Sequence, residues 1–325
     1  MSISRATIMA LLRLENLRTC YFTPNGPAMA VDGVSFELKE GETLGLVGES
    51  GCGKTTTALS IIRLLPSYAK ILEGKVIFNG TDLTTLDNNS MRKVRGKEMS
   101  MVFQGSMQAL NPLMKIGDQI AESVIQHEHC TNRRALRRAE ELLKLVGMDA
   151  SRISNYQHEL SGGMRQRAMI AVALACQPKL LIADEPATAL DVIVQARVLN
   201  LMRDLKKNHD LSMIMITHDL SVVAEMCDRV AVMYAGKIVE CADIISLHSN
   251  PLHPYTQGLL GAFPSIRGPK KTLSFIRGMP PNLLNPPRGC RFHPRCPYVM
   301  DICRTEEPKL IKTAEGRSVA CHLVK

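Results

Sequence analysis

The stretch Gly48-Glu49-Ser50-Gly51-Cys52-Gly53-Lys54-Thr55 decides the fold. It matches the pattern G-x-x-x-x-G-K-[ST], in which glycines let the backbone curl until its N–H groups face the oxygens of a phosphate. The apolar run 43–47 precedes it and residues 55–65 have the pattern of a helix, so the loop lies between a strand and a helix N-terminus. That N-terminus adds its own partial positive charge. The stretch predicts a nucleotide phosphate site in an α/β fold.

Each residue type in this loop has a predicted role. The Lys54 ammonium should bridge the β- and γ-phosphates of a nucleotide, and the Thr55 hydroxyl should bind Mg²⁺. The backbone of residues 48–53 and the neighbouring Thr56 complete the predicted phosphate site. Cys52 occupies a variable position of the pattern, so we interpret its side chain as a small group without chemistry of its own.

A second half of the site is predicted far along the chain. The run Leu180-Leu181-Ile182-Ala183-Asp184-Glu185 is an apolar strand that ends in two carboxylates. Asp184 is placed to hold Mg²⁺, and Glu185 is placed to orient or deprotonate the attacking water. An acidic pair at a strand end is often structural, but in a chain that also has a phosphate loop it predicts catalysis.

Between the two motifs stands Leu160-Ser161-Gly162-Gly163-Met164-Arg165-Gln166-Arg167. Here the chain resembles the ATP-binding-cassette (ABC) ATPases, whose signature is L-S-G-G-Q or a close variant; Met164 departs from the commonest fifth residue. Ser161 and the amides of Gly162 and Gly163 should form another anion site at a helix N-terminus. The resemblance implies that this site closes over the γ-phosphate bound to the opposite subunit of a head-to-tail dimer.

Other positions of the family pattern follow in order. Tyr21 matches the aromatic residue that stacks on adenine, with neighbouring Phe22 as the alternative. Gln104 matches a glutamine that senses Mg²⁺ and water, and Asp191, in Ala189-Leu190-Asp191, matches a loop at the dimer interface. His218 matches the histidine that contacts the γ-phosphate. The expected catalytic set is Glu185, His218 and Gln104, and the expected Mg²⁺ ligands are Thr55, Gln104 and Asp184.

The order of patterns along the chain predicts its organisation. Residues 12–48 read as short strands, residues 115–150 have a helical period, and a proline-rich stretch at 245–289 makes a regular core element unexpected there. We predict an α/β phosphate-loop ABC ATPase domain over residues 12–249, with an antiparallel β subdomain and a helical subdomain that carries the signature. A small irregular extension is predicted over residues 250–325.

The extension itself resembles a known segment. Asn250 to Gln257 reads NPLHPYTQ, and PPRGC at 286–290 and PRCP at 294–297 follow. These runs are similar to the C-terminal extension of oligopeptide/dipeptide importer ATPases, a subfamily that also includes transporters of nickel, glutathione and oligosaccharides. The resemblance implies a second ABC ATPase subunit (a heterodimer, or else a homodimer), two integral membrane permease subunits and an extracytoplasmic solute-binding protein.

Four of the ten cysteines fall near the end of the chain, as Cys290, Cys296, Cys303 and Cys321. Four thiolates can hold a zinc ion or an iron–sulfur cluster. Zinc sites favour close C-x₂₋₄-C pairs, which this spacing lacks, and the resemblance implies a [4Fe–4S] cluster. Zinc and free thiols are the alternatives.

Composition limits the remaining function classes. The net charge is +9, and no run reaches the 18 apolar residues of a membrane-spanning helix, so we expect a peripheral protein at the cytoplasmic face of the membrane. A soluble ABC ATPase acting on nucleic acid or ribosomes is the main alternative. Aromatic residues are 4% of the chain and Trp is absent, so no stacking platform for nucleic acid is evident. We therefore predict an importer ATPase that uses ATP and Mg²⁺, without nucleic acid as a partner.

Overall fold

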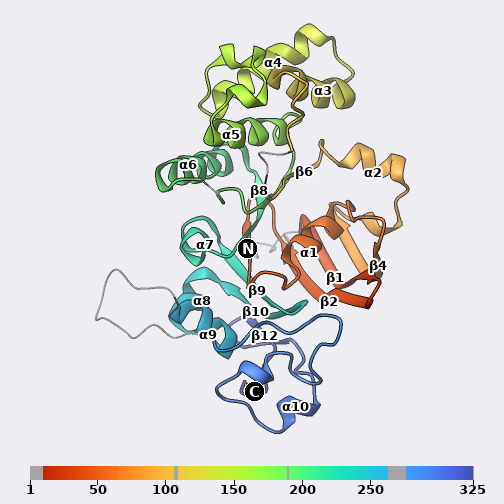
Figure 1. Cartoon of the computed structure of the whole chain (residues 1–325), viewed down its shortest axis with the longest axis vertical. Helices are drawn as coiled ribbons and strands as arrows, with labels where there is room; N and C mark the ends of the chain where they lie inside the picture. The colour runs from red at the N-terminus through yellow and green to blue at the C-terminus, as the bar shows by residue number, and fades with distance from the viewer. Residues whose placement is uncertain (1–9, 106–108, 189, 263–275, 325) are drawn as a thin grey trace, which may run out of the picture. The chain divides into compact units, whose positions relative to one another are not determined.

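Residues 10–105, 109–188, 190–262 and 276–324 are described by a computed structural model of the chain. The chain forms two units, coloured by residue number in Figure 1. The first contains the chain up to residue 38, residues 44–84 and the chain from residue 217 onward. The second contains residues 39–43 and 85–216. The C-terminal extension thus shares a unit with the phosphate loop.

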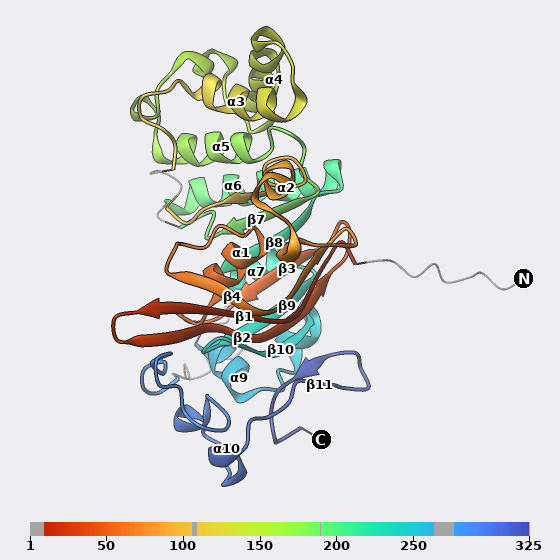
Figure 2. The same cartoon turned by 90° about the vertical axis from the view of Figure 1, so that its right-hand side faces the viewer.

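The first unit begins with an antiparallel sheet, whose strands are among the red and orange arrows of Figure 2. Its strands are β1 (Leu12–Thr23), β2 (Gly26–Leu38), β4 (Ala69–Phe78) and β5 (Thr81–Asp82), in the order β2-β1-β4-β5. On β1, Leu12 and Leu14 are buried while Arg13 between them is exposed, the alternation expected of a sheet with one face on a core. The predicted antiparallel β subdomain is confirmed, with longer strands than the sequence indicated.

A second sheet of this unit leads to the phosphate loop. Strand β3 (Thr43–Val47) is buried along its whole length and runs parallel to β9 (Arg229–Tyr234), with Val47 opposite Val232. Helix α1 (Lys54–Ile61) starts at the end of the loop that follows β3. Strand β10 (Lys237–Asp243) pairs antiparallel with β9, and the short helix α7 (Leu220–Met226) precedes β9. The predicted strand–loop–helix order is present.

The extension adds regular structure that the sequence analysis did not expect. Helices α8 (Ile244–Ser249) and α9 (Pro254–Gly261) form within the proline-rich stretch. Pro254 is tolerated because it lies in the first turn of α9, where no N–H is needed for the helix ladder. The expectation of no core element was wrong here, since Tyr255 of α9 is completely buried.

The rest of the extension rejoins the second sheet. It contains a 3₁₀ turn (His293–Arg295), helix α10 (Ile302–Thr305), β11 (Ile311–Lys312) and β12 (Ser318–Val319). Strand β12 pairs with β10, so the strand order on this side is β11-β12-β10-β9-β3. Strand β11 of the extension is therefore an edge of the sheet from which the phosphate loop starts.

The second unit combines three parallel strands with helices. Strands β8 (Ser212–Thr217), β7 (Leu180–Asp184) and β6 (Met99–Val102) lie in that order and are buried throughout. The helices are α2 (Asn88–Val94), α3 (Ile116–Glu128), α4 (Asn132–Leu145), α5 (Gly162–Ala173) and α6 (Val192–His209), with 3₁₀ turns at Ala150–Ser154 and Gln157–Glu159. The predicted helical subdomain carrying the signature is confirmed.

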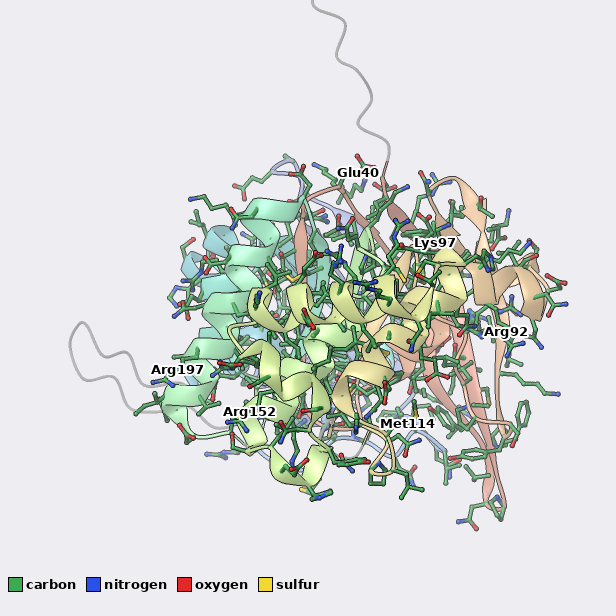
Figure 3. The ribbon with its side chains drawn as sticks, turned by 90° about the horizontal axis from the view of Figure 1, so that it is seen from above. Glu40, Arg92, Lys97, Met114, Arg152 and Arg197 are labelled. Atoms are coloured by element: carbon green, nitrogen blue, oxygen red, sulfur yellow. The ribbon has the colours of Figure 1, made fainter. Side chains whose placement is uncertain are left out.

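The outside of this unit has exposed side chains of both charges. Figure 3 labels Glu40, Arg92, Lys97, Arg152 and Arg197 among them, and all five are exposed. The helices instead bury apolar faces, such as Ile120 and Val124 of α3. Within the described ranges, the structure contains no helix of the length and apolarity that crossing a membrane requires.

A buried ion pair fastens the extension to β10. The Glu240 side chain is fully buried and its carboxylate accepts hydrogen bonds from the backbone N–H groups of Leu252 and His253, both at 2.9 Å. Arg317 donates to the same carboxylate at 2.9 Å and to the Asn250 carbonyl at 2.6 Å. A buried carboxylate without its cation is costly, so this pair couples the last strand to the helices before it.

We predict that Arg317→Met lowers the free energy of unfolding by about 3 kcal/mol, because it leaves Glu240 buried without its counter-charge. Urea titration of the whole chain measures the change. Lys312→Met is the matched control, since Lys312 is exposed on β11, and it should leave the midpoint unchanged. An Arg317→Met midpoint equal to that of the control would show that the pair does not hold the extension.

Candidate nucleotide site

The phosphate loop is curled so tightly that two of its glycines cannot be replaced. Gly48 has φ +149° and Gly53 has φ +107°, in the region that favours glycine. A Cβ on Gly48 would lie 2.2 Å from the Met233 carbonyl oxygen, and a Cβ on Gly53 would lie 2.2 Å from that of Ala30. The loop is therefore pressed against the main chain of β9 and β2, and its shape is fixed by backbone contacts.

The Lys54 ammonium lies inside this curl. It donates to the Gly48 carbonyl at 2.6 Å and to the Glu49 carbonyl at 3.1 Å, and the Cys52 sulfur is 3.7 Å away. Burial raises the pKa of the Cys52 thiol, so this side chain stays protonated and uncharged. Lys54 thus supplies the positive charge at the centre of the loop.

The two candidate aromatic residues occupy different surroundings. The Tyr21 hydroxyl is 3.4 Å from the hydroxyl of Thr56 on α1, and its ring lies 5.8 Å from that of Tyr68. Phe22, the next residue on β1, is 49% exposed. Since successive side chains of a strand point to opposite faces, Tyr21 is the one on the α1 side.

The carboxyl ends of β6 and β7 bring Gln104 to Glu185. The two strands are parallel neighbours, with Val102 opposite Ala183, so the residues that follow them meet at the same edge. Gln104 Nε2 donates to Glu185 Oε2 at 3.0 Å, and the Thr188 hydroxyl donates to the same oxygen at 3.1 Å. Two donors thus orient one carboxylate.

Glu185 itself has an unusual backbone. Its φ is +49°, a conformation that costs a non-glycine residue of order 1 kcal/mol. Its N–H donates to the Ile216 carbonyl of β8 at 2.8 Å, which holds the turn in place. The preceding Asp184 is the last residue of β7 and its side chain is 1% exposed. The two carboxylates therefore differ, one buried in the strand end and one turned out of it.

The signature residues begin helix α5. Ser161 is its exposed N-cap residue, and Gly162 and Gly163 form its first turn. Gly163 is required by close packing, because a Cβ there would lie 2.3 Å from a methyl carbon of Val194 on α6. Asp191 caps α6 by accepting from the Val194 N–H at 2.9 Å. Ala189 of the same predicted loop lies outside the described residues.

His218 follows β8 directly, and its side chain is exposed. The predicted site residues thus form two groups. The first unit contains the phosphate loop, Tyr21 and His218, and the second contains Gln104, Asp184, Glu185, the signature residues and Asp191.

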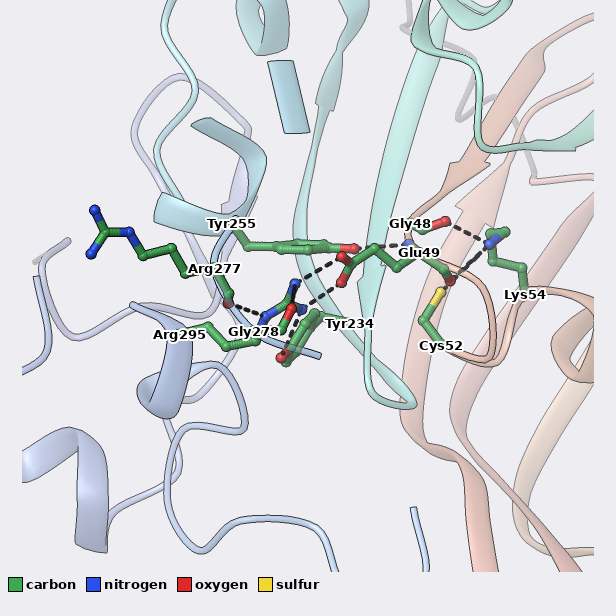
Figure 4. A network of polar contacts seen from close by, with 9 residues as sticks. All are labelled: Gly48, Glu49, Cys52, Lys54, Tyr234, Tyr255, Arg277, Gly278 and Arg295. Atoms are coloured by element: carbon green, nitrogen blue, oxygen red, sulfur yellow. Dashed lines mark hydrogen bonds and ion pairs between the residues drawn. The ribbon is translucent and has the colours of Figure 1, made fainter. Parts of the chain in front are cut away.

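Two residues at the loop were not predicted. Figure 4 shows the Tyr255 hydroxyl accepting from the Glu49 N–H at 2.8 Å and Arg295 bridging the Glu49 carboxylate at 2.6 and 2.9 Å. The sequence analysis quoted both residues only as part of the extension's resemblance. The only pattern around Arg295 is the run PRCP at 294–297, and this run does not indicate a contact with the phosphate loop.

The four late cysteines line one small cavity, together with Phe292, His253 and His293. Burial, and then the nearness of the other three thiols, raises the pKa of Cys290 to about 11. Among the residues that the structure describes, no group of three or more His, Cys, Asp and Glu side chains is arranged to hold a metal ion. The thiols therefore converge without forming a ready metal site.

Comparison with known proteins places these features in one family. Residues 31–188 match the family model described as ABC transporter, and residues 239–303 match the model described as oligopeptide/dipeptide transporter, C-terminal region. The oligopeptide transport ATP-binding protein AppD of Bacillus subtilis is 50% identical over 316 residues, which cover 96% of each chain. The chain belongs to the ATP-binding subunits of oligopeptide/dipeptide ABC transporters.

Other members of this family agree along the same length. The oligopeptide transport ATP-binding protein OppD of Escherichia coli is 46% identical over 96% of this chain and 93% of its own. A solved structure of the ATP-binding cassette MJ0796, a dimer in a post-hydrolysis state bound to ADP and Pi, has a TM-score of 0.66 and 27% identity. It covers 72% of this chain and 98% of that one, and it confirms the phosphate-loop ABC ATPase fold.

We predict that Gly53→Ala weakens ATP binding by about tenfold or more, because the new methyl group must displace the loop from Ala30. Titration with a fluorescent ATP analogue measures the dissociation constant. Gly80→Ala is the control, since Gly80 has φ +78° but nothing within 4 Å of its Cβ position. Equal affinities in the two variants would mean that the close approach does not set the loop geometry.

Proposed function

We propose that the chain hydrolyses ATP to drive the import of di- or oligopeptides through separate membrane subunits. The observation that carries the proposal is the match of the C-terminal region, residues 239–303, to the oligopeptide/dipeptide transporter model. Relatives named for oligopeptide and dipeptide transport support it over almost the whole chain. Nickel, glutathione and oligosaccharides are the other solutes that the subfamily would admit. The relatives give no support to an ATPase that acts on nucleic acid or ribosomes.

The proposed chemistry divides between the two groups of residues. Lys54 and the loop N–H groups bind the phosphates, and Tyr21 stacks on adenine. Asp184, Thr55 and Gln104 offer the oxygen ligands that Mg²⁺ prefers, and the ion would neutralise charge on the phosphates when bound. Glu185, oriented by Gln104 and Thr188, accepts a proton as water bonds to the γ-phosphorus and the bond to the ADP oxygen breaks.

The remaining residues support a shared site. Ser161, Gly162 and Gly163 at the start of α5 would close over the γ-phosphate on the opposite subunit, and Asp191 would lie near that interface. His218 would contact the γ-phosphate. The dimer reported for MJ0796 is consistent with this arrangement. We propose a heterodimer with a second ABC ATPase, with a homodimer as the alternative, together with two permease subunits and an extracytoplasmic solute-binding protein. The chain would then lie at the cytoplasmic face of the membrane.

The experiment that tests this function uses the assembled transporter in lipid vesicles. We expect a di- or oligopeptide, delivered by the solute-binding protein, to raise the rate of phosphate release. Glu185→Gln should keep ATP binding and slow hydrolysis by about 100-fold or more, because the water loses its base. Glu122→Gln, an exposed change on α3, is the control. Stimulation by nickel or glutathione and by no peptide would transfer the proposal to those solutes.

We also propose that Cys290, Cys296, Cys303 and Cys321 ligate a [4Fe–4S] cluster. Their convergence on one cavity supports it, and so does the scarcity of apolar residues in the segment, which favours stabilisation by a ligated group. Iron would hold the four thiols as thiolates, against the burial that raises the pKa values of Cys290, Cys296 and Cys321. Zinc and free thiols remain the alternatives.

Protein purified without oxygen should be brown, with about four irons per chain and absorption that any one of the four Cys→Ser changes abolishes. Cys176→Ser is the control, because Cys176 lies on a different unit and donates to the Ser123 carbonyl. One zinc per colourless chain would decide for zinc, and no metal at all for free thiols.

A further inference from the structure

The C-terminal extension contacts the phosphate loop at one residue, Glu49. Arg295 donates to Glu49 Oε2 at 2.6 Å through one terminal nitrogen and to Oε1 at 2.9 Å through the other. The Arg295 side chain is 5% exposed and that of Glu49 is 27% exposed. This is a bidentate pair largely removed from water, the geometry in which arginine binds a carboxylate most strongly.

Every nitrogen of the Arg295 guanidinium is engaged. Its Nε donates to the Arg277 carbonyl at 2.9 Å, and one terminal nitrogen also donates to the Gly278 carbonyl at 3.1 Å. The other lies 3.3 Å from the Tyr234 hydroxyl. These contacts fix the guanidinium independently of Glu49, so it is a rigid support for the loop. Figure 4 shows the network.

A second contact holds the backbone of the same residue. The Tyr255 hydroxyl accepts from the Glu49 N–H at 2.8 Å, and Tyr255 is completely buried. Its ring packs 4.6 Å from Tyr234 and 5.4 Å from Phe292, measured between centroids. The extension therefore holds Glu49 both by its main chain and by its side chain.

These contacts lead directly to Lys54. The Glu49 carbonyl accepts from the Lys54 ammonium at 3.1 Å, and the Gly48 carbonyl accepts at 2.6 Å. The lysine that is to meet the phosphates is thus positioned by a residue that Arg295 and Tyr255 hold in turn.

The positive charge of Arg295 also affects how the loop would interact with a negatively charged nucleotide. A carboxylate within a loop that binds phosphate repels the nucleotide unless a nearby cation neutralises it. Among the residues that the structure describes, Arg295 is the cation that pairs with the Glu49 carboxylate. Without that pair, repulsion would rise with the number of negative charges on the nucleotide and would weaken ATP more than ADP.

We propose that Arg295 and Tyr255 are positioning residues for nucleotide binding, with Arg295 also neutralising Glu49 so that the loop accepts the more highly charged nucleotide. This rests on ATP binding at the phosphate loop and is independent of the solute transported.

The test measures ATP and ADP dissociation constants of the full chain, with the unfolding midpoint recorded for each variant. Arg295→Met should raise the ATP constant about tenfold and the ADP constant about threefold. Tyr255→Phe keeps all charges and should raise both constants by a similar factor, about threefold. Arg288→Met, an exposed change in the same extension, should alter neither.

The double variant Glu49→Gln/Arg295→Met removes both charges, so it should fold even if Arg295→Met does not. Its ATP-to-ADP affinity ratio should return to that of the unchanged chain. A purely structural arginine would lower the midpoint without changing this ratio in Arg295→Met. That result, or a double variant whose ratio stays shifted, overturns the inference. An unchanged chain that binds no ATP would instead overturn the proposed function.

Discussion

The close approach of the phosphate loop to two carbonyl groups is the constraint on which the first unit depends. Gly48 must pass the Met233 carbonyl and Gly53 must pass that of Ala30, with no room for a Cβ at either position. The loop is also tied by the Gly236 N–H, which donates to the Cys52 carbonyl at 2.8 Å. Strands β2 and β9 thus shape the loop through their main-chain carbonyl groups, and the placement of Lys54 follows from this packing.

In the second unit, strand pairing positions the side chains of the candidate site. Parallel pairing of β6 and β7 places Gln104 beside Glu185. The backbone of Glu185 is strained, and the hydrogen bond from its N–H to the Ile216 carbonyl holds it in that conformation. Asp184, one residue earlier, remains in the buried strand. A single step along the backbone therefore gives two neighbouring carboxylates different surroundings, as the metal ligand and the base that we propose would require.

The sequence could predict those parts of the fold and site whose determinants are local. The loop 48–55, the strand before Asp184 and the helix after Ser161 each depend on residues that are adjacent in the chain, so their pattern is visible without the fold. Helix α9 was missed because eight prolines between 251 and 287 indicated irregular structure, although Pro254 needs only the first turn of a helix. The Glu49–Arg295 pair was beyond sequence reasoning, because no local pattern relates two residues so far apart.

That separation affects the protein while it is being made. Glu49 and Arg295 are 246 residues apart, so at ribosomal rates of about 5–20 residues per second the loop emerges roughly 12–50 s before its arginine. Until Arg295 emerges the Glu49 carboxylate has no ion-pair partner from the extension, and for the first 206 of these residues the tyrosine that accepts from the Glu49 N–H is missing as well. If Arg295 and Tyr255 position the loop as proposed, a growing chain binds ATP more weakly than a finished one. The loop is among the first parts translated, yet its contact with Arg295 can form only after residue 295 has been made.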